Sequence, residues 1–138
     1  MTGLEHERAL LDTSVVIGFD FAQVELLPGE CAISALTLAE LSSGPSAATN
    51  EAVRAARQDR LQRVEAAFSA LPFDSQAARA FGRIAPELRS AGRKPRGANL
   101  ADYLIAATAL SHDLPLYTLD PEDVAPLANL IEIVPIKA

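Results

Sequence analysis

The amino-acid sequence predicts an α/β protein, an α/β/α sandwich in which a central, mainly parallel sheet is flanked by helices. Short apolar segments typical of buried strands alternate with longer segments of helical periodicity along almost the whole chain. A strand that leads through a helix into another strand usually pairs in parallel. The chain has 138 residues, 49% of them hydrophobic, and no linker of useful length, so residues 1–138 are expected to form one domain.

The first half of the chain is expected to contribute two strands and three helices. Ala9–Leu11 and Cys31–Ser34 are short apolar segments and are predicted to be buried strands. Helices are expected after them, over Val15–Phe21 and Leu36–Ser43. A long helix is predicted over Asn50–Leu71. Its apolar face consists of four residues: Val53, Leu61, Val64 and Phe68.

The second half is expected to continue the alternation. A brief strand over Leu71–Phe73 precedes a helix over Ser75–Ala91, with Ser75 as its candidate N-cap and Pro86 producing a kink or two pieces. A helix, a strand, a short helix and a final strand are then predicted over Leu100–His112, Pro115–Thr118, Pro121–Ala128 and Leu130–Pro135. In such proteins the active site lies beyond the carboxyl ends of the strands, near a switch in strand order.

The charges are distributed unevenly along the chain. A net charge of −6 by itself argues against nucleic-acid binding. Residues 52–97, however, carry ten basic and four acidic residues, a net charge of +6, which leaves −12 for the rest. This asymmetry is expected where phosphates approach one surface and metal-binding carboxylates occupy another.

Several features favour a cytoplasmic protein that does not enter a membrane. No apolar run approaches the roughly 20 residues of a membrane span, and the charged N-terminus lacks the order of a signal peptide. Cys31 is the only cysteine, so no internal disulfide can form. We interpret it as a small buried strand residue rather than a catalytic thiol.

Four acidic residues are the candidates for chemistry: Asp12, Glu40, Asp102 and Asp120. Asp12 and Asp120 end predicted strands, Asp102 falls in the first turn of a helix, and Glu40 lies on the helix after the second strand. Convergence at one end of the sheet would create an oxygen-rich site for Mg²⁺ or Mn²⁺. Such an ion activates water for attack on a phosphodiester. The chain offers no Walker A or GxGxxG motif as a competing site.

Each acid also has an ordinary structural explanation. Asp12 and Asp120 are candidate helix N-caps. Asn99 could cap the helix that carries Asp102, and Asp102 could answer as in a capping box. Glu40 could be a surface residue of a short helix. The grouping of these acids at strand-to-helix junctions therefore carries more weight than any one of them.

Four segments together resemble the PIN-domain toxins of the VapC type, the ribonuclease halves of bacterial toxin–antitoxin pairs. The segments are LLDTS, ALTLAEL, ADYLIAATAL and LPLYTLD, in this order, and the resemblance spans about residues 10–135. It implies a PIN-like fold and a Mg²⁺- or Mn²⁺-dependent endoribonuclease toxin of a type II toxin–antitoxin system, acting on tRNA or rRNA. The segment LDPEDVAPL departs from the family by having Asp120 and Val124 where Asn and Phe are frequent. The roles of Asp120 and Asp123 therefore stay open.

The resemblance also implies roles for individual residues. Asp12 and Asp102 would be the principal metal ligands, and Glu40 and Asp120 would complete the catalytic metal site directly or through water. Three hydroxyl residues would position a ligand or the scissile phosphate: Thr13, Ser14 and Thr118.

RNA binding is expected from two groups of basic residues. One is the loop before Asp102, with Arg93, Lys94 and Arg96. The other is a stripe along the long helix, which could equally be a solvated helix face: Arg54, Arg57, Arg60 and Arg63. Phosphate contacts would make binding steeply salt-dependent.

The expected partners are an RNA substrate, a VapB-type antitoxin that blocks the acidic site, and a second copy of the chain in a homodimer. Two alternatives are a catalytically inactive PIN-fold module that binds RNA or protein, and a metal-dependent nuclease that acts on DNA. The inactive module predicts a missing acid, whereas all four are present. DNA nucleases of this fold are usually longer than this chain.

Overall fold

A five-stranded sheet forms the centre of the protein in the computed structural model, which describes residues 6–19 and 21–137. The strand order is β3-β2-β1-β4-β5, and every adjacent pair is parallel. The strands are β1 (Arg8–Leu11), β2 (Glu30–Ser34), β3 (Ser69–Leu71), β4 (Leu116–Thr118) and β5 (Ile133–Pro135). The predicted α/β class is confirmed, and this sheet is parallel throughout.

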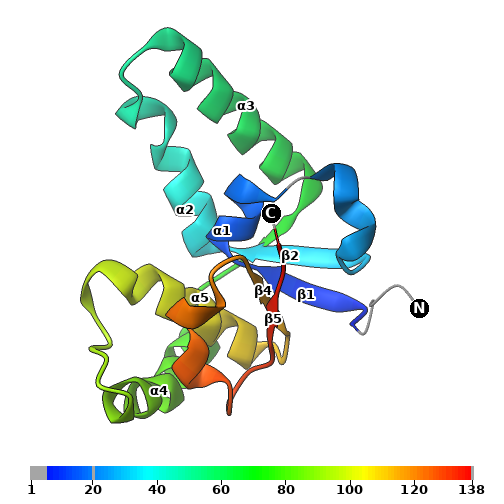
Figure 1. Cartoon of the computed structure of the whole chain (residues 1–138). Helices are drawn as coiled ribbons and strands as arrows, with labels where there is room; N and C mark the ends of the chain where they lie inside the picture. The colour runs from blue at the N-terminus through cyan, green and yellow to red at the C-terminus, as the bar shows by residue number, and fades with distance from the viewer. Residues whose placement is uncertain (1–5, 20, 138) are drawn as a thin grey trace.

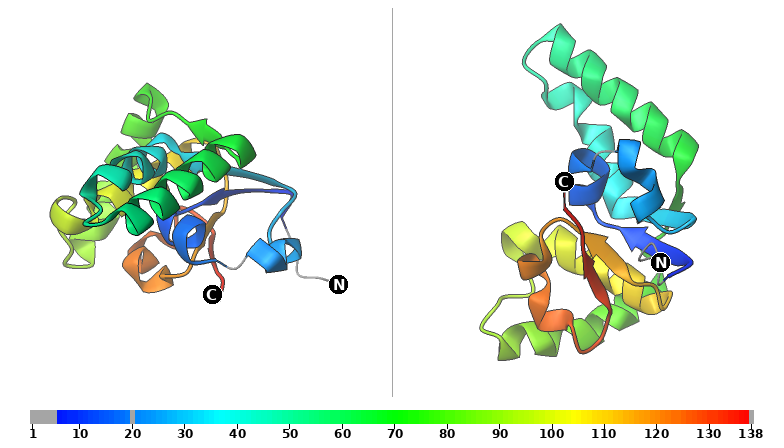
Figure 2. Two further views of the ribbon diagram at one scale, coloured as in Figure 1. Left: turned by 90° about the horizontal axis from the view of Figure 1, so that it is seen from above. Right: turned by 45° about the vertical axis from the view of Figure 1, so that its right-hand side comes forward.

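Helices cover both faces of the sheet (Figure 1). The α-helices are α1 (Thr13–Gly18), α2 (Ala35–Ser43), α3 (Glu51–Ala67), α4 (Ser75–Ser90) and α5 (Leu100–Ser111). Short 3₁₀ turns occupy connections: η1 (Phe21–Leu26), η2 (Pro45–Ala47), η3 (Gly97–Asn99), η4 (Pro121–Asp123) and η5 (Ala125–Leu127). The right-hand view in Figure 2 agrees with Figure 1 that the α2–α3 hairpin extends away from the sheet. In the described part of the chain, no helix combines the length and apolar character needed to cross a membrane.

Alternating strand residues belong to two separate cores. Leu10 of β1 and Leu116 of β4 are buried in the core that includes residues of α4 and α5. Leu11 and Tyr117, one position further along each strand, are buried in the core that includes residues of α1 and α3. Because both faces are buried, the central strands are apolar at nearly every position instead of alternating with polar residues.

The strand order reverses between β1 and β4. From β1 the chain proceeds to β2 and β3 on one side of the sheet, and then returns to add β4 and β5 on the other side. The carboxyl ends of β1 and β4 are therefore neighbours, and the Asp12 N–H donates to the Tyr117 carbonyl across this junction at 3.0 Å. Such a switch point is the usual place for a binding site in a parallel sheet.

Helix α3 is shorter than predicted. The helix expected to run to Leu71 ends at Ala67, where Phe68 adopts extended backbone angles. Ser69–Leu71 then pairs with Ala32–Ser34 of β2, so the strand lies earlier than the predicted Leu71–Phe73. Pairing with a neighbouring strand has overridden local helical periodicity here.

One prediction about helix α4 is wrong, and one of the two outcomes expected at Pro86 is excluded. Asp74, rather than Ser75, caps it, because the Asp74 carboxylate accepts from the Ala77 N–H at 3.0 Å. Pro86 does not divide the helix into two pieces. Pro86 leaves the carbonyl of Gly82 without its helical donor, and Gly82 is exposed to water. Buried Ile84 and Leu88 hold the helix to the core on both sides of the proline.

Two other predicted helices differ in extent. The helix expected over Val15–Phe21 begins earlier, at Thr13, because Asp12 caps it, and residue 20 lies outside the described residues. The helix expected over 121–128 is two 3₁₀ turns, η4 and η5, separated by Val124 with backbone angles of −121° and 10°. Pro126 has no N–H to continue an α-helix through this segment. The last strand covers Ile133–Pro135 and not the three residues before it.

We expect Ile105→Ala to lower the free energy of unfolding by about 3 kcal/mol. Ile105 has no exposed surface and packs in the core beside α4, so truncation removes apolar burial and leaves a cavity. Urea denaturation followed by circular dichroism measures the loss. Ile17→Ala is the control, because Ile17 is 49% exposed and should change stability by less than about 0.5 kcal/mol. Equal effects of the two substitutions would contradict this account of the core.

Candidate active site

Asp12 lies where β1 ends and α1 begins, and its carboxylate is held by one oxygen. Oδ1 accepts from the Val15 N–H at 3.3 Å and from the Ser14 hydroxyl through a short hydrogen bond. The capping role is therefore real, and Asp12 is only 9% exposed. Oδ2 has no hydrogen-bond partner among the described residues, so capping leaves one carboxylate oxygen able to bind a cation.

Ser14 connects the carboxyl ends of β1 and β4 through hydrogen bonds of its side chain. Besides donating to Asp12, its Oγ accepts from the Leu119 N–H at 3.1 Å and lies 3.5 Å from Thr118 Oγ1. Thr118 is fully buried, and its hydroxyl accepts from the Asp120 N–H at 2.9 Å. These hydroxyls fix the start of the acidic segment after β4 relative to Asp12.

Glu40 on α2 is exposed, and its side chain is held by a hydrogen bond from α1. The Thr13 hydroxyl donates to Glu40 Oε1 at 2.8 Å and lies 2.9 Å from the Thr37 hydroxyl. Thr37 is fully buried, so it anchors this pair to the interior. Because Thr13 directly follows Asp12, the contact brings Glu40 to the carboxyl end of β1.

Asp102 is partly buried in the first turn of α5, and the capping alternative proposed for it is not observed. Asn99 makes no side-chain capping bond, because η3 runs directly into α5. Burial, and after it the negative charges of four other acids, together raise the pKa of the Asp102 carboxyl from its ordinary 3.8 to about 6. The four acids, in decreasing order of effect, are Asp12, Asp123, Glu40 and Asp120.

The segment after β4 contributes two acids. Asp120 is exposed and makes no side-chain capping bond to η4, so its capping alternative is not observed either. Asp123 is half-buried, and burial together with the charges of Asp120, Glu122 and Asp12 raises its pKa, while Arg93 lowers it. Asp123 affects Asp102 more than Glu40 or Asp120 does. Its role is open from the sequence pattern alone, and in the structure its charge acts on Asp102.

Among the described residues, no ion pair involves these acids. The ion pairs of the described residues are His6–Glu132, Arg54–Glu51 and Arg63–Asp59, and none involves the five acids of the site. The acids do not close around one point, since no three His, Cys, Asp or Glu side chains of the described residues form a ready metal cage. An all-carboxylate set that is open in this way suits Mg²⁺ or Mn²⁺, because Mg²⁺ usually keeps several waters and binds through one or two carboxylates.

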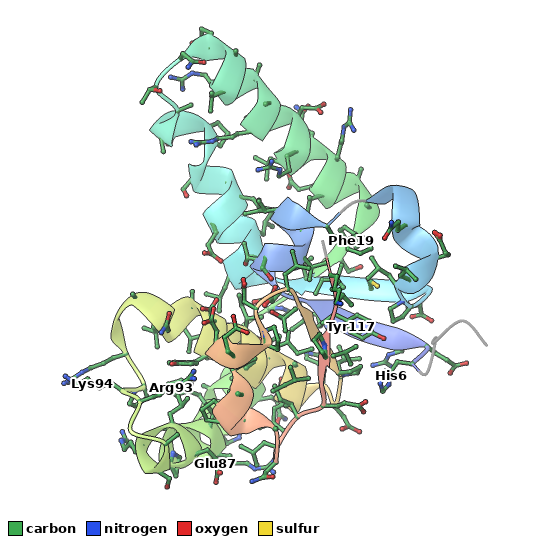
Figure 3. All side chains as sticks on the ribbon, in the orientation of Figure 1. His6, Phe19, Glu87, Arg93, Lys94 and Tyr117 are labelled. Carbon is green, nitrogen blue, oxygen red and sulfur yellow. The ribbon has the colours of Figure 1, made fainter. Side chains whose placement is uncertain are left out.

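The three predicted basic residues beside the site differ in environment. Arg93 points inward to η4, whereas Lys94 points away from the protein (Figure 3). The Arg93 guanidinium donates to the main-chain carbonyls of Asp123 and Glu122. Lys94 and Arg96 are exposed, and the loop lines a hollow of about 510 Å³. RNA binding by these residues stays a prediction, for which the structure leaves Lys94 and Arg96 more accessible than Arg93.

The basic stripe on α3 is largely occupied with contacts inside the hairpin. Arg54 donates to the Pro45 carbonyl and pairs with Glu51, and Arg57 donates to the Gly44 carbonyl. A further pair joins Arg63 to Asp59 one turn away. These contacts hold the α2–α3 turn, and phosphate binding by the stripe stays a prediction.

A second hollow, of about 570 Å³, lies at the opposite end of the sheet, around the first residues of β1, β2 and β3. It includes Cys31, whose pKa is raised to about 11 by burial. A thiol with such a pKa stays protonated and unreactive near neutral pH. None of the acids of the site lines this hollow.

Two proteins to which this chain is similar are named ribonucleases. The chain matches the PIN domain over residues 9–126. It is 38% identical over 130 residues to "Ribonuclease VapC5" of Mycobacterium tuberculosis, with 91% of this chain and 93% of the relative covered. It is 30% identical over 125 residues to "Ribonuclease VapC1" of Rickettsia felis, with 88% and 91% covered.

A solved structure shows the same fold. The crystal structure of VapBC-5, from the VapBC family of toxin–antitoxin systems of Mycobacterium tuberculosis, matches with a TM-score of 0.82. The matched residues are 37% identical and cover 95% of this chain and 100% of the other. The chain belongs to the PIN-domain family, in its VapC branch, as the resemblance implied.

We expect Asp102→Asn to stabilise the metal-free protein above about pH 6. The folded-state pKa of Asp102 lies above its ordinary value, so ionising this carboxyl costs the fold on the order of 2 kcal/mol. The gain from Asn should be absent near pH 4, should grow as pH rises, and should be complete above about pH 6. Thermal unfolding in EDTA from pH 4 to 8 measures it.

Asp113→Asn is the matched control, because Asp113 is exposed at the other end of α5 and has a φ of 54°, which Asn tolerates. It should leave the pH profile unchanged. An equal profile for wild type and Asp102→Asn would contradict the inferred repulsion among the acids.

Proposed function

We propose that this chain is a Mg²⁺- or Mn²⁺-dependent endoribonuclease, the toxin of a type II toxin–antitoxin pair, which hydrolyses phosphodiester bonds in tRNA or rRNA. The observation that carries the proposal is the set of acids around Asp102, whose charges raise its pKa and which have no cationic partner among the described residues. Relatives named ribonucleases, matched over most of their length, support the choice of RNA.

Asp12 and Asp102 would hold the cation directly, and Glu40 and Asp120 would hold it through its waters. Once bound, the ion would lower the pKa of a water molecule and offset charge on the scissile phosphate. Hydroxyl groups beside these acids would keep the carboxylates oriented for metal binding. Ser14 keeps Asp12 Oδ1 fixed, which leaves Oδ2 for the cation, and Thr13 holds Glu40 beside it.

Lys94 and Arg96 are proposed to bind RNA phosphates next to the acidic site. They line the same hollow as Arg89, and η3 alone separates this loop from the helix of Asp102. Positive charge there would offset the repulsion between the RNA backbone and the acids. RNA binding should therefore weaken steeply with salt.

A VapB-type antitoxin is proposed to inhibit the enzyme by covering the acids. The similar structure of VapBC-5 comes from a family of toxin–antitoxin systems. An arginine from such a partner would suit carboxylates that form no ion pair among the described residues. A homodimer is also proposed, and light scattering of the purified chain would give its mass.

Cleavage of total cellular RNA tests the proposed activity. Wild type should give discrete products with Mg²⁺ or Mn²⁺ and none in EDTA. Asp12→Ala and Asp102→Asn should each reduce the rate by at least about 100-fold, because each removes a proposed direct ligand. Asp113→Asn should cut like wild type, and end-mapping of the products would identify the RNA.

The same assay separates the alternatives. If wild type, free of antitoxin, cuts no RNA with any divalent metal but cuts DNA, the protein is a DNA nuclease. If it cuts neither and still binds RNA, the inactive binding module is the better description. Cleavage that persists in EDTA and in both acid variants would contradict the metal site itself.

A further inference from the structure

Arg93 belongs to the hydrogen-bonded motif that ends helix α4. Helix α4 ends in a Schellman motif, in which Gly92 has a φ of +78° and donates to the Arg89 carbonyl at 3.0 Å. The Arg93 N–H donates to the Leu88 carbonyl at 2.8 Å, which closes the motif. Since Leu88 is fully buried, the main chain at Arg93 is fixed to the core.

The Arg93 side chain joins this helix end to η4. Its Nη1 donates to the Asp123 carbonyl at 2.5 Å and its Nη2 to the Glu122 carbonyl at 2.7 Å. One planar guanidinium thus binds two successive carbonyls of a segment about thirty residues away in the sequence, a geometry that Lys cannot reproduce. Figure 3 shows this inward direction of Arg93.

The segment that Arg93 binds has little structure of its own. η4 is a single 3₁₀ turn, with Asp123 N–H donating to Asp120 at 3.1 Å and Val124 N–H donating to Pro121 at 3.2 Å. An isolated turn of this kind is not stable alone. It therefore depends on contacts outside itself.

Contacts outside η4 anchor both ends of the segment, and η4 also lies against β5. At its start, the Thr118 hydroxyl accepts from the Asp120 N–H. At its end, Val124 is buried in the core beside α4 and α5. The Arg93 guanidinium holds the carbonyls of the residues between these two anchors, including that of Asp123.

We propose that Arg93 is a positioning residue of the acidic site: it fixes η4 so that Asp120 and Asp123 lie beside Asp102, and it does not serve as an RNA ligand. This inference rests on the proposed metal-dependent activity. The contact is made to carbonyls and not to carboxylates, so the arginine orders the acids without neutralising them. This contact also distinguishes the role of Arg93 from that of Lys94 and Arg96, which are exposed in the same loop.

The charge of Arg93 and its geometry have opposite consequences for a bound cation. A positive charge near the site repels a cation, so loss of charge alone would tighten Mn²⁺ binding. Loss of the two carbonyl contacts would loosen η4 and weaken Mn²⁺ binding. Arg93→Lys keeps the positive charge but loses the paired hydrogen bonds to the two carbonyls. Arg93→Met loses both, so the two variants distinguish the effect of charge from the effect of geometry.

Titration of the RNA-free protein with Mn²⁺ at pH 7.5, followed by calorimetry, is the first measurement. Arg93→Lys should weaken Mn²⁺ binding roughly tenfold, the lower end of the usual effect of residues that orient metal ligands. Arg93→Met should weaken it less, because a charge that repels the cation is lost as well. Arg83→Met should bind Mn²⁺ as wild type does, since Arg83 is an exposed arginine of α4 on which η4 does not depend. Binding of a labelled RNA hairpin in EDTA should be the same for all four proteins.

Hydrogen exchange of the metal-free protein is the second measurement. Peptides over residues 119–125 should exchange faster in both Arg93 variants and not in Arg83→Met. Unchanged exchange in these peptides, or Mn²⁺ binding that is unchanged or tighter in Arg93→Met, would overturn the positioning role. RNA binding that falls while Mn²⁺ binding stays intact would overturn it as well and make Arg93 a phosphate ligand.

Failure of the proposed activity would look different. Wild type would then neither bind Mn²⁺ nor cut RNA, although exchange at 119–125 would still rise in the Arg93 variants. In that case Arg93 orders η4 but the ordered acids are not a metal site, and the inference fails together with the activity.

Discussion

The parallel pairing of β1 with β4 is the constraint on which the site depends. Leu11 is in register with Tyr117, and the next residue of β1, Asp12, donates its N–H to the Tyr117 carbonyl. This pairing places the chain after each strand at the same edge of the sheet. The acids after β1 and after β4 are thereby neighbours although more than a hundred residues separate them in the sequence. The other acids reach the same edge because α2 follows β2 and α5 leads back into β4.

Bringing these carboxylates together destabilises the fold, and uncharged hydrogen-bond donors reduce the destabilisation. Asp12 is stabilised by the Ser14 hydroxyl and a helix N–H, and Glu40 by the Thr13 hydroxyl. These donors orient the carboxylates without introducing a charge that would compete with a metal. Asp102 has no such donor among the described residues, and its pKa is raised first by burial and then by the charges of the other acids. A cation bound beside Asp102, as proposed, would offset this destabilisation.

The sequence predicted the site residues well where they lie at the ends of strands and helices with a clear local pattern. Asp12, Glu40 and Asp102 lie at or near ends of strongly periodic elements, so their approach to one another followed from the predicted parallel sheet. The segment after Asp120 was predicted less well, as one helix instead of two 3₁₀ turns. Its conformation is set by Pro126 and by a guanidinium about thirty residues earlier, and local sequence does not reveal the second of these. For the same reason, charge alone could not separate Arg93 from Lys94.

The position of Arg93 is compatible with the cation site proposed for these acids. An arginine paired with Asp102 or Asp123 would lower the repulsion among the acids and occupy the oxygens that a metal needs. Directed at the carbonyls of Glu122 and Asp123, the same side chain supplies order and leaves the oxygens free. Its charge is still felt, since it lowers the pKa of Asp123 against the effect of burial. The fold thus directs its nearby cation at main-chain carbonyls, which leaves the carboxylate oxygens to the proposed metal ion or to the arginine of the proposed antitoxin.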